Sequence, residues 1–248
     1  MQSQSSLPVT QYVVISLNEG LFTTFVDRNS ATGIAFRHFA GVDGKTITSR
    51  SQTRGILAEG ATRYSPGAVG CAMSHAALWK QCASSADNFV IFEDDALLRD
   101  DFVNQYHALL ASQRSWDVIF FGCNTDTIVS VPYAGGIDFT GQFSALYPNP
   151  GQLAAFAKLT DAATLLRLKF SFGPCGYVIS PAGARKLIEK CLPMDNRPVH
   201  IEPENRSFPA YSIDCMMIAA YSQIDAFMCF PPLVMTPNDQ ATSQTVNT

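Results

Sequence analysis

The sequence lacks the features that mark nucleic-acid-binding and membrane-spanning proteins. Its 17 lysines and arginines form no basic block, and the net charge is −4. A nucleic-acid surface normally requires a clustered basic footprint, so we expect no nucleic-acid partner. No apolar run reaches the roughly 18 residues that a transmembrane helix needs. We therefore expect no transmembrane segment, while peripheral contact with a membrane stays compatible with the sequence.

A disulfide pattern and a signal peptide are also missing. The seven cysteines are odd in number and scattered, several of them within apolar segments. This usage is typical of reduced thiols in a cytoplasmic protein. The polar, Ser/Gln-rich start has no basic region followed by an apolar core. We expect a cytoplasmic protein with a flexible leader over residues 1–11 and a flexible tail over residues 236–248.

The sequence contains short apolar runs that alternate with segments of helical periodicity. Its length suits one α/β domain. Runs of this kind are typical of strands buried on both faces of a parallel sheet. The expected strands cover residues 12–17, 34–40, 89–92, 116–122, 176–180 and 227–234. The expected helices cover residues 69–82, 101–113 and 181–191, with a further helix from residue 212 and a loop at residues 18–20.

Three adjacent acids follow one of these strands directly. The apolar residues 89–92 run into Glu93, Asp94 and Asp95. They fall at the carboxyl end of the strand, where open α/β sheets bind ligands. Neighbouring carboxylates repel one another, and a divalent cation with oxygen ligands is the simplest group that joins them. The alternative is a solvent-exposed acidic turn.

Polar residues at other strand ends are candidate nucleotide contacts. Leu17 and Asn18 close the first strand, where such folds bind a base or ribose. Asp43 follows the second strand within Asp-Gly and either contacts the nucleotide or forms a tight turn. Asn124 follows the strand of residues 116–122 and lies at the same expected ligand edge.

The helix of residues 69–82 carries Cys71 and His75 four residues apart, on one face with Leu78 and Cys82. A Cys-x3-His pair could hold a metal ion, but a closed zinc site requires four ligands. The favoured interpretation is a packed face with His75 hydrogen-bonded at its edge.

Two later segments have little periodicity. Residues 130–151 are rich in Gly, Pro and Tyr and are long for a passive loop, so we expect a flap over an acceptor. Residues 192–210 are Pro-rich and contain Asp195 and His200. Asp214 follows at the start of a short helix, where it is also placed to act as a cap.

In these motifs the chain resembles glycosyltransferase family 25, which includes lipooligosaccharide and collagen galactosyltransferases. The likeness extends over residues 12–234. Its motifs are Val-Ile-Ser-Leu (14–17), Ala-Gly-Val-Asp-Gly-Lys (40–45), Gly-Cys-Ala-Met-Ser-His (70–75), Ile-Phe-Glu-Asp-Asp-Ala (91–96), Gly-Tyr-Val-Ile-Ser (176–180) and Pro-Leu-Val (232–234). The family's basic segment after the first strand is replaced here by residues 18–22, which leaves Arg28 as its remnant.

The resemblance implies a GT-A type α/β fold, with a mostly parallel central sheet flanked by helices. It implies one transferase domain over residues 12–235, in which 12–125 binds the nucleotide sugar and 126–235 forms the acceptor side. It also implies inverting transfer of a hexose, galactose or glucose, from a UDP-sugar. The acceptor would be a hydroxyl of a glycan, lipid-linked glycan or protein, such as lipooligosaccharide, and the cofactor Mn²⁺ or Mg²⁺.

For such a reaction we expect Asp95 to be the main metal ligand, with Glu93 assisting directly or through water. Asp94 would contact the ribose or the donor sugar. His200 is a further candidate ligand, although a surface histidine is the simpler interpretation.

Inversion requires a base within hydrogen-bond reach of the acceptor hydroxyl. Asp214 is the first candidate and Asp195 the reserve, with helix capping as the alternative role of Asp214. His75 would support the donor site or be structural.

Two other functions fit the same residues. A metal-dependent phosphohydrolase also uses acids at strand ends, but it normally gathers more His and Asp ligands than four histidines allow. A catalytically degenerate nucleotide-sugar-binding protein is the other alternative. The missing basic segment favours it, and the intact Glu-Asp-Asp opposes it.

Overall fold

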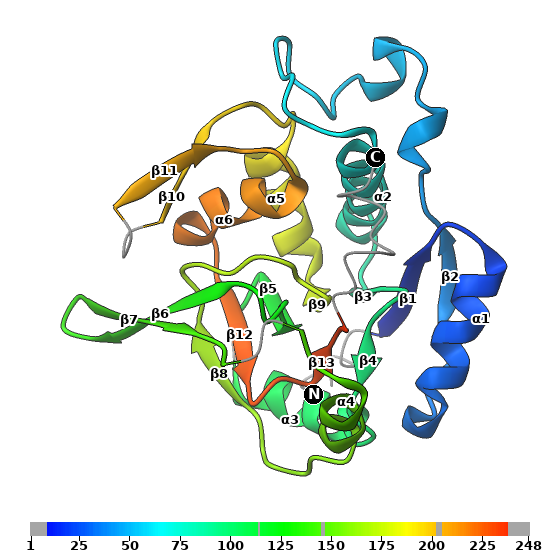
Figure 1. The fold of residues 1–248 in the computed structure, drawn as a ribbon, viewed down its shortest axis with the longest axis vertical. Coiled ribbons are helices and arrows are strands. Elements are labelled where there is room, and N and C mark those ends of the chain that lie inside the picture. Colours follow the sequence, from blue (N-terminus) through cyan, green and yellow to red (C-terminus); the bar gives the residue numbers. More distant parts are fainter. Residues whose placement is uncertain (1–8, 114, 145–146, 202–204, 238–248) are drawn as a thin grey trace, which may run out of the picture.

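The computed structural model describes residues 9–113, 115–144, 147–201 and 205–237. Its centre is a seven-stranded sheet in the order β2-β1-β3-β9-β5-β12-β8 (Figure 1). Five strands run in one direction, and β9 and β8 run antiparallel to their neighbours. The strands are β1 (Thr10–Ser16), β2 (Arg37–Ala40), β3 (Asn88–Glu93), β5 (Val118–Gly122), β8 (Thr164–Arg167), β9 (Gly176–Ile179) and β12 (Ala226–Phe230). The expectation of a mostly parallel sheet flanked by helices is confirmed.

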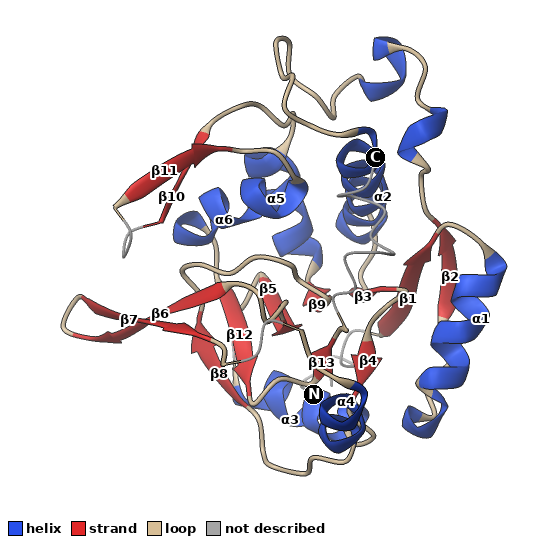
Figure 2. Ribbon diagram, in the orientation of Figure 1, coloured by secondary structure: helices blue, strands red, loops and turns tan. Residues whose placement is uncertain are grey.

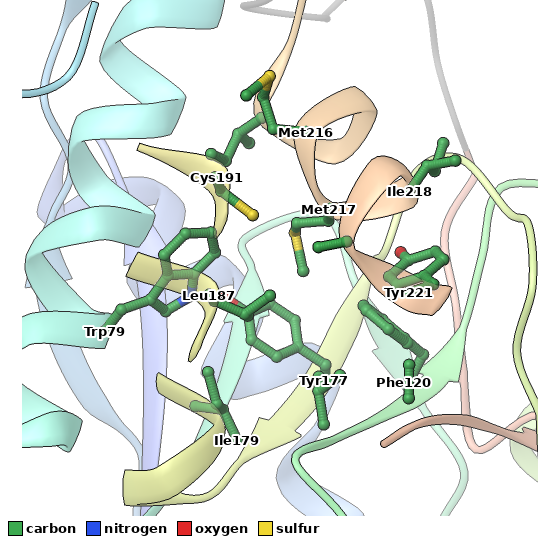
Figure 3. Packing of buried hydrophobic residues seen from close by; sticks show 14 of the residues in the cluster. Trp79, Phe120, Tyr177, Ile179, Leu187, Cys191, Met216, Met217, Ile218 and Tyr221 are labelled. Atoms are coloured by element: carbon green, nitrogen blue, oxygen red, sulfur yellow. Dashed lines mark hydrogen bonds between the residues drawn. The ribbon is translucent and has the colours of Figure 1, made fainter. Parts of the chain in front are cut away.

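Helices cover both faces of this sheet (Figure 2). They are α1 (Glu19–Arg28), α2 (Pro66–Ala83), α3 (Phe102–Ser112), α4 (Pro150–Ala157), α5 (Pro181–Cys191) and α6 (Ile213–Ala220). Side chains alternate along each strand, so Ile91 of β3 packs with α2, α5 and α6 while Phe92 packs with α1 and α3. Figure 3 shows the first of these cores, in which Trp79 and Tyr177 lie close to α5 and α6. No helix of the described residues is both long and apolar enough to cross a bilayer.

Local sequence signals explain where the main helices begin. Ser65 and Ser180 each accept a backbone N–H at the start of a helix, and each is followed by proline at the first helical position. The expected loop at residues 18–20 is wrong. Asn18 accepts the backbone N–H of Leu21 and caps α1, which begins at Glu19.

The segments of low periodicity form hairpins rather than loops. Residues 128–142 contain β6 (Ile128–Ala134) and β7 (Ile137–Gln142), joined by two glycines with positive φ at 135 and 136. The Pro-rich segment contains β10 (Pro198–Ile201) and β11 (Arg206–Pro209). Both hairpins project from the body of the molecule (Figure 1). The acceptor flap expected over 130–151 is therefore an ordered hairpin followed by α4, and its role stays a prediction.

The chain ends differ slightly from expectation. Thr10 and Gln11, assigned to the leader, already belong to β1 and pair with Asn88 and Phe89 of β3. Residues 1–8 and 238–248 lie outside the described residues. Near the C-terminus, β13 (Val234–Met235) pairs with β4 (Leu97–Leu98) directly after the three acids. The late strands β9, β12 and β8 share the sheet with the early ones, so both parts of the expected domain are built on it.

Candidate active site

The three acids lie where β3 ends and the chain turns into β4. Thr236, which follows β13, donates a hydrogen bond from Oγ1 to Asp95 Oδ2 over 2.5 Å. Asp95 Oδ1 is buried and has no hydrogen-bond partner among the described residues. Arg28, at the end of α1, donates from Nη1 to the Asp95 carbonyl over 2.8 Å. The acids are thus partly buried and tied to two distant segments, which a freely solvated turn would not be.

Two of the three acids have raised pKa values. Burial, followed by repulsion from Glu93, raises the pKa of Asp95 to about 6, although Thr236 and Arg28 oppose the shift. Burial and the other two carboxylates also raise the pKa of Asp94 to about 6. Clustered carboxylate oxygens, one of them buried without a donor, are the ligands that Mn²⁺ and Mg²⁺ prefer. The residues present therefore fit a divalent cation at Asp95.

A buried hydrogen-bond relay orients His75 toward Glu93. Trp79 Nε1 donates to Tyr177 Oη over 2.8 Å, and Tyr177 Oη lies 2.8 Å from His75 Nδ1. Tyr177 Oη accepts from Trp79, and donation of its own proton to Nδ1 is the arrangement that places the ring proton on Nε2. His75 Nε2 lies 3.5 Å from Glu93 Oε1. The relay therefore presents an N–H donor to the first acid.

The Gly-Cys-Ala-Met-Ser-His motif positions α2 against the end of β2. A Cβ on Gly70 would come within 2.3 Å of the Val42 carbonyl oxygen, so this close approach requires glycine. Ser74 Oγ accepts the Val42 N–H over 2.9 Å and donates to the Gly70 carbonyl. Glycine and serine thus fix the helix, while Cys71 and His75 face the acids.

Cys71, His75 and Glu93 bring one ligand atom each within 4.8 Å of one another. Burial, then the Glu93 and Asp214 carboxylates, raise the pKa of the Cys71 thiol well above its usual value. A zinc ion at this trio would require a thiolate and an unprotonated Nε2. The neutral thiol and the relay oppose both. The geometry favours the packed, hydrogen-bonded histidine over a metal ligand.

Asp214 reaches the same region from α6. Its Oδ2 accepts the Gly173 N–H over 3.3 Å, and Asn124 N donates to the Gly173 carbonyl over 3.0 Å. Its Oδ1 accepts from Ser212 Oγ and from the Cys215 N–H. Ser212 occupies the N-cap position of α6 without a side-chain capping hydrogen bond, and Asp214 is the second residue of the helix, where it faces the loop before β9. Asn124 and Asp214 are therefore brought together with Cys71 and Glu93.

Of three other predicted nucleotide contacts, Asn18 and Asp43 have local capping roles. Asn18 caps α1, as described above, and Leu17 beside it is partly exposed. Asp43 Oδ1 accepts the Lys45 N–H over 2.9 Å and caps the 3₁₀ helix Gly44–Thr46. These residues lie at the carboxyl ends of β1 and β2, and any nucleotide contact of theirs stays a prediction.

Two predicted residues lie apart from the acids. Asp195 forms a two-pronged ion pair with Arg197, which holds the pKa of that carboxyl below its usual value. Arg197 occupies both carboxylate oxygens of Asp195, so the geometry favours Asp214 over Asp195 as the base. His200 Nδ1 contacts Ser207 Oγ across the β10–β11 hairpin, on the far side of α5 and α6 from β3 (Figure 1).

Sequence reasoning missed three supporting residues. Trp79 lies in the expected helix of residues 69–82 and Tyr177 in the Gly-Tyr-Val-Ile-Ser motif, but neither pattern indicates that the two side chains are in contact. Thr236 is a single threonine in a polar stretch, 141 positions from Asp95, and no local pattern identifies it. Arg28 was noted as a basic remnant, and its contact with the Asp95 carbonyl places it beside the acids.

The glycosyltransferase family 25 model, described as an LPS biosynthesis protein family, matches residues 10–200. The chain belongs to this family. It is 28% identical over 142 residues to the probable inactive glycosyltransferase 25 family member 3 of Rattus norvegicus, which covers 52% of this chain and 20% of the relative. It is 23% identical over 185 residues to a glycosyltransferase 25 family member of Anopheles gambiae, which covers 66% of this chain and 26% of the relative.

A glycosyltransferase 25 family member of Drosophila pseudoobscura pseudoobscura is 26% identical over 186 residues, 66% of this chain and 25% of the relative. The chain thus spans about a fifth to a quarter of the length of the curated relatives that it matches. Family membership supports a transferase at family level, and the relatives include proteins named as inactive.

Proposed function

We propose that this chain is an inverting glycosyltransferase of GT-A type that depends on a divalent cation. It transfers a hexose, galactose or glucose, from a UDP-sugar to a hydroxyl of a glycan or glycoconjugate. The observation that carries the proposal is the buried Oδ1 of Asp95, which has no hydrogen-bond partner in the described part of the chain, beside two further acids at the carboxyl end of β3. The description of the matching family supports an acceptor of the lipopolysaccharide class.

Each residue has a defined task in this proposal. Asp95 and Glu93 hold the cation, and Thr236 and Arg28 fix the turn that carries Asp95. When bound, Mn²⁺ or Mg²⁺ supplies a Lewis acid that stabilises charge on the leaving diphosphate. Asp94 contacts the ribose or the donor sugar from the same turn.

Asp214 is the base in this proposal. Its carboxylate is held by the Gly173 N–H and by Ser212, so its orientation is set before an acceptor binds. It accepts the proton of the acceptor hydroxyl as that oxygen attacks the anomeric carbon from the face opposite the diphosphate. Asn124, whose backbone N–H donates to the carbonyl of the same Gly173, contacts the nucleotide in this proposal.

We further propose that the protein works in the cytoplasm. All seven cysteines are free thiols in the structure, and six of them are buried. Reduced, buried thiols are what a reducing compartment maintains.

A nucleotide panel tests the donor and the cation together. The melting temperature is measured with UDP, GDP and CMP, each with and without Mn²⁺. A ligand that binds only the folded state raises the melting temperature. UDP with Mn²⁺ should give the largest shift, and UDP-galactose or UDP-glucose should be hydrolysed slowly. A larger shift with GDP or CMP, or one that does not depend on Mn²⁺, would contradict the proposal.

A catalytically degenerate nucleotide-sugar-binding protein is the second candidate, because relatives named as inactive match this chain. It predicts the UDP-dependent shift without hydrolysis or transfer. A phosphohydrolase is less well supported, since His38 pairs with Glu19 and His200 with Ser207 rather than with the acids.

A further inference from the structure

A cavity of about 600 Å³ opens on the α6 side of the molecule, next to the β10–β11 hairpin. Its lining includes Phe172, Phe208 and Tyr211, together with two arginines, Arg63 and Arg206. The aromatic residues come from the loop before β9, from β11 and from the segment before α6. The arginines come from the segment before α2 and from β11. Figure 1 shows this hairpin beside α6, away from the turn that carries the acids.

The three rings form one continuous surface. Phe172 lies 6.5 Å from Tyr211 with the ring planes 22° apart, and 5.7 Å from Phe208. Phe208 and Tyr211 are 5.9 Å apart, and Tyr211 is 49% exposed. Ligand pockets typically combine such aromatic walls with a few polar groups that set orientation. The apolar C–H face of a sugar ring packs well on an aromatic ring, so this surface suits a pyranose.

Two of the residues that line the cavity are close in the chain to the proposed base or to its hydrogen-bond partner. Phe172 precedes Gly173, whose N–H donates to Asp214 Oδ2, and Tyr211 lies three positions before Asp214. Burial, followed by the charges of Cys215, Asp214 and Asp126, raises the pKa of Tyr211 to about 12, so its hydroxyl stays protonated. The end of the cavity at Tyr211 therefore has carboxylates nearby and favours the neutral, hydroxyl-bearing part of a ligand.

The arginines give the cavity a second recognition element. Guanidinium groups bind carboxylates and phosphates through paired hydrogen bonds. The cavity lining contains two arginines, although the chain as a whole has a net charge of −4. Arg63 and Arg206 both line the cavity, and both are exposed.

We propose that this cavity is the acceptor subsite and that it binds a sugar that bears a carboxylate or phosphate group. The sugar ring stacks on Phe172 and Tyr211, its anionic group contacts Arg63 and Arg206, and one hydroxyl faces Asp214. The assignment as an acceptor subsite rests on the proposed transferase function. The preference for an anionic sugar rests on the cavity itself.

Binding of three small probes tests this preference by saturation-transfer NMR and isothermal titration. Methyl β-glucuronide carries a carboxylate, mannose 6-phosphate carries a phosphate, and methyl β-glucoside is the neutral control. At least one anionic probe should bind tenfold or more tightly than the neutral one, and which of them binds identifies the group. Equal binding of all three probes, or binding of none, would overturn the proposal.

Variants separate charge from stacking. Arg63→Ala should weaken the anionic probe about tenfold and leave the neutral probe unchanged. Tyr211→Ala should weaken both kinds of probe. Arg54→Ala, an exposed arginine outside the cavity lining, is the matched control and should bind as wild type does. An unchanged affinity in Arg63→Ala and Arg206→Ala would refute the assigned role of the arginines.

A donor readout distinguishes this proposal from the proposed function. Arg63→Ala should retain the wild-type melting shift with UDP and Mn²⁺. If the wild-type protein shows no such shift but still binds the anionic probe through Arg63, the transferase proposal fails while the anionic-sugar site stands. If the shift is present and the anionic probe does not bind, the cavity proposal alone fails.

Discussion

Replacing Tyr177 with phenylalanine isolates the relay that connects the core to the first acid. The substitution keeps the ring in place and removes one oxygen. It leaves two buried groups without a partner, the Trp79 Nε1–H and the His75 Nδ1. Each unsatisfied buried group costs about 1–3 kcal/mol. We expect the free energy of unfolding to fall by about 3 kcal/mol, which lowers the melting temperature of a chain of this size by roughly 6–12 °C.

The same substitution should impair catalysis in a specific way. Without the Tyr177 hydroxyl, the relay no longer sets which ring nitrogen of His75 accepts and which one donates toward Glu93. Hydrolysis of the UDP-sugar should slow at saturating donor, and the ¹⁵N chemical shifts of His75 should report a mixture of tautomers. These shifts separate a positioning role from simple loss of stability.

Tyr106→Phe is the matched control for this experiment. Tyr106 is also buried and shares a 2.9 Å hydrogen bond with Thr10, but it lies on the α3 face of the sheet. It should lose some stability and keep the wild-type activity and His75 tautomer. If Tyr177→Phe melts and turns over as the wild type does, with His75 Nε2 still protonated, the relay is refuted.

Three further predictions follow from the ion pairs and the acids. Arg99 is fully buried and pairs with Asp101 through two hydrogen bonds. Asp101→Ala leaves this buried charge without its partner, so it should lower the free energy of unfolding in urea by about 3 kcal/mol. Wild-type stability of the variant would contradict the prediction. The pKa values of Asp94 and Asp95 are raised to about 6 in the folded state, so this state binds more protons than the unfolded chain between about pH 4 and 6. The contribution of these two acids to the free energy of unfolding is therefore present below about pH 4 and lost as the pH rises through about 6. It is measured in EDTA as the difference in unfolding free energy between the wild type and the variant with both Asp94 and Asp95 replaced by Asn, and this difference should fall between about pH 4 and 6. A difference that does not change with pH would refute the prediction. Asp214→Asn should keep the UDP-dependent melting shift and lose transfer by at least a hundredfold, whereas normal turnover would place the base elsewhere.

The central strands and their helices could be predicted because their signals are local. The apolar run of residues 89–92 and the Ser-Pro pair at 180–181 each specify an element without help from the rest of the chain. Strand direction is not local. The sequence of β9 indicates a strand but not its antiparallel insertion between β3 and β5, which the packing of the whole sheet determines. The β10–β11 hairpin was missed because its strands are four residues long and each has a proline at one end.

In the candidate site, too, local sequence signals identify some residues, whereas other contacts are created only by the fold. The three acids and His75 stand in recognisable motifs and Asp214 stands at the start of an expected helix, so these residues could be singled out before their geometry was known. The partner of Asp95 could not be, because Thr236 reaches it only through the pairing of β13 with β4. The alternative role of Asp214 as a helix cap could be judged only from the structure, which places Ser212 at the N-cap position while the Asp214 carboxylate accepts the Cys215 N–H in the first turn.

Binding of Mn²⁺ to Asp95→Ala tests the central claim most directly. Free Mn²⁺ is titrated by electron paramagnetic resonance in the presence of UDP, for wild type, Asp95→Ala and the exposed control Asp161→Ala. The account predicts that wild type and Asp161→Ala bind Mn²⁺ alike and that Asp95→Ala loses at least a hundredfold in affinity while it remains folded. Wild-type affinity in Asp95→Ala would show that the acids at the end of β3 do not hold the cation.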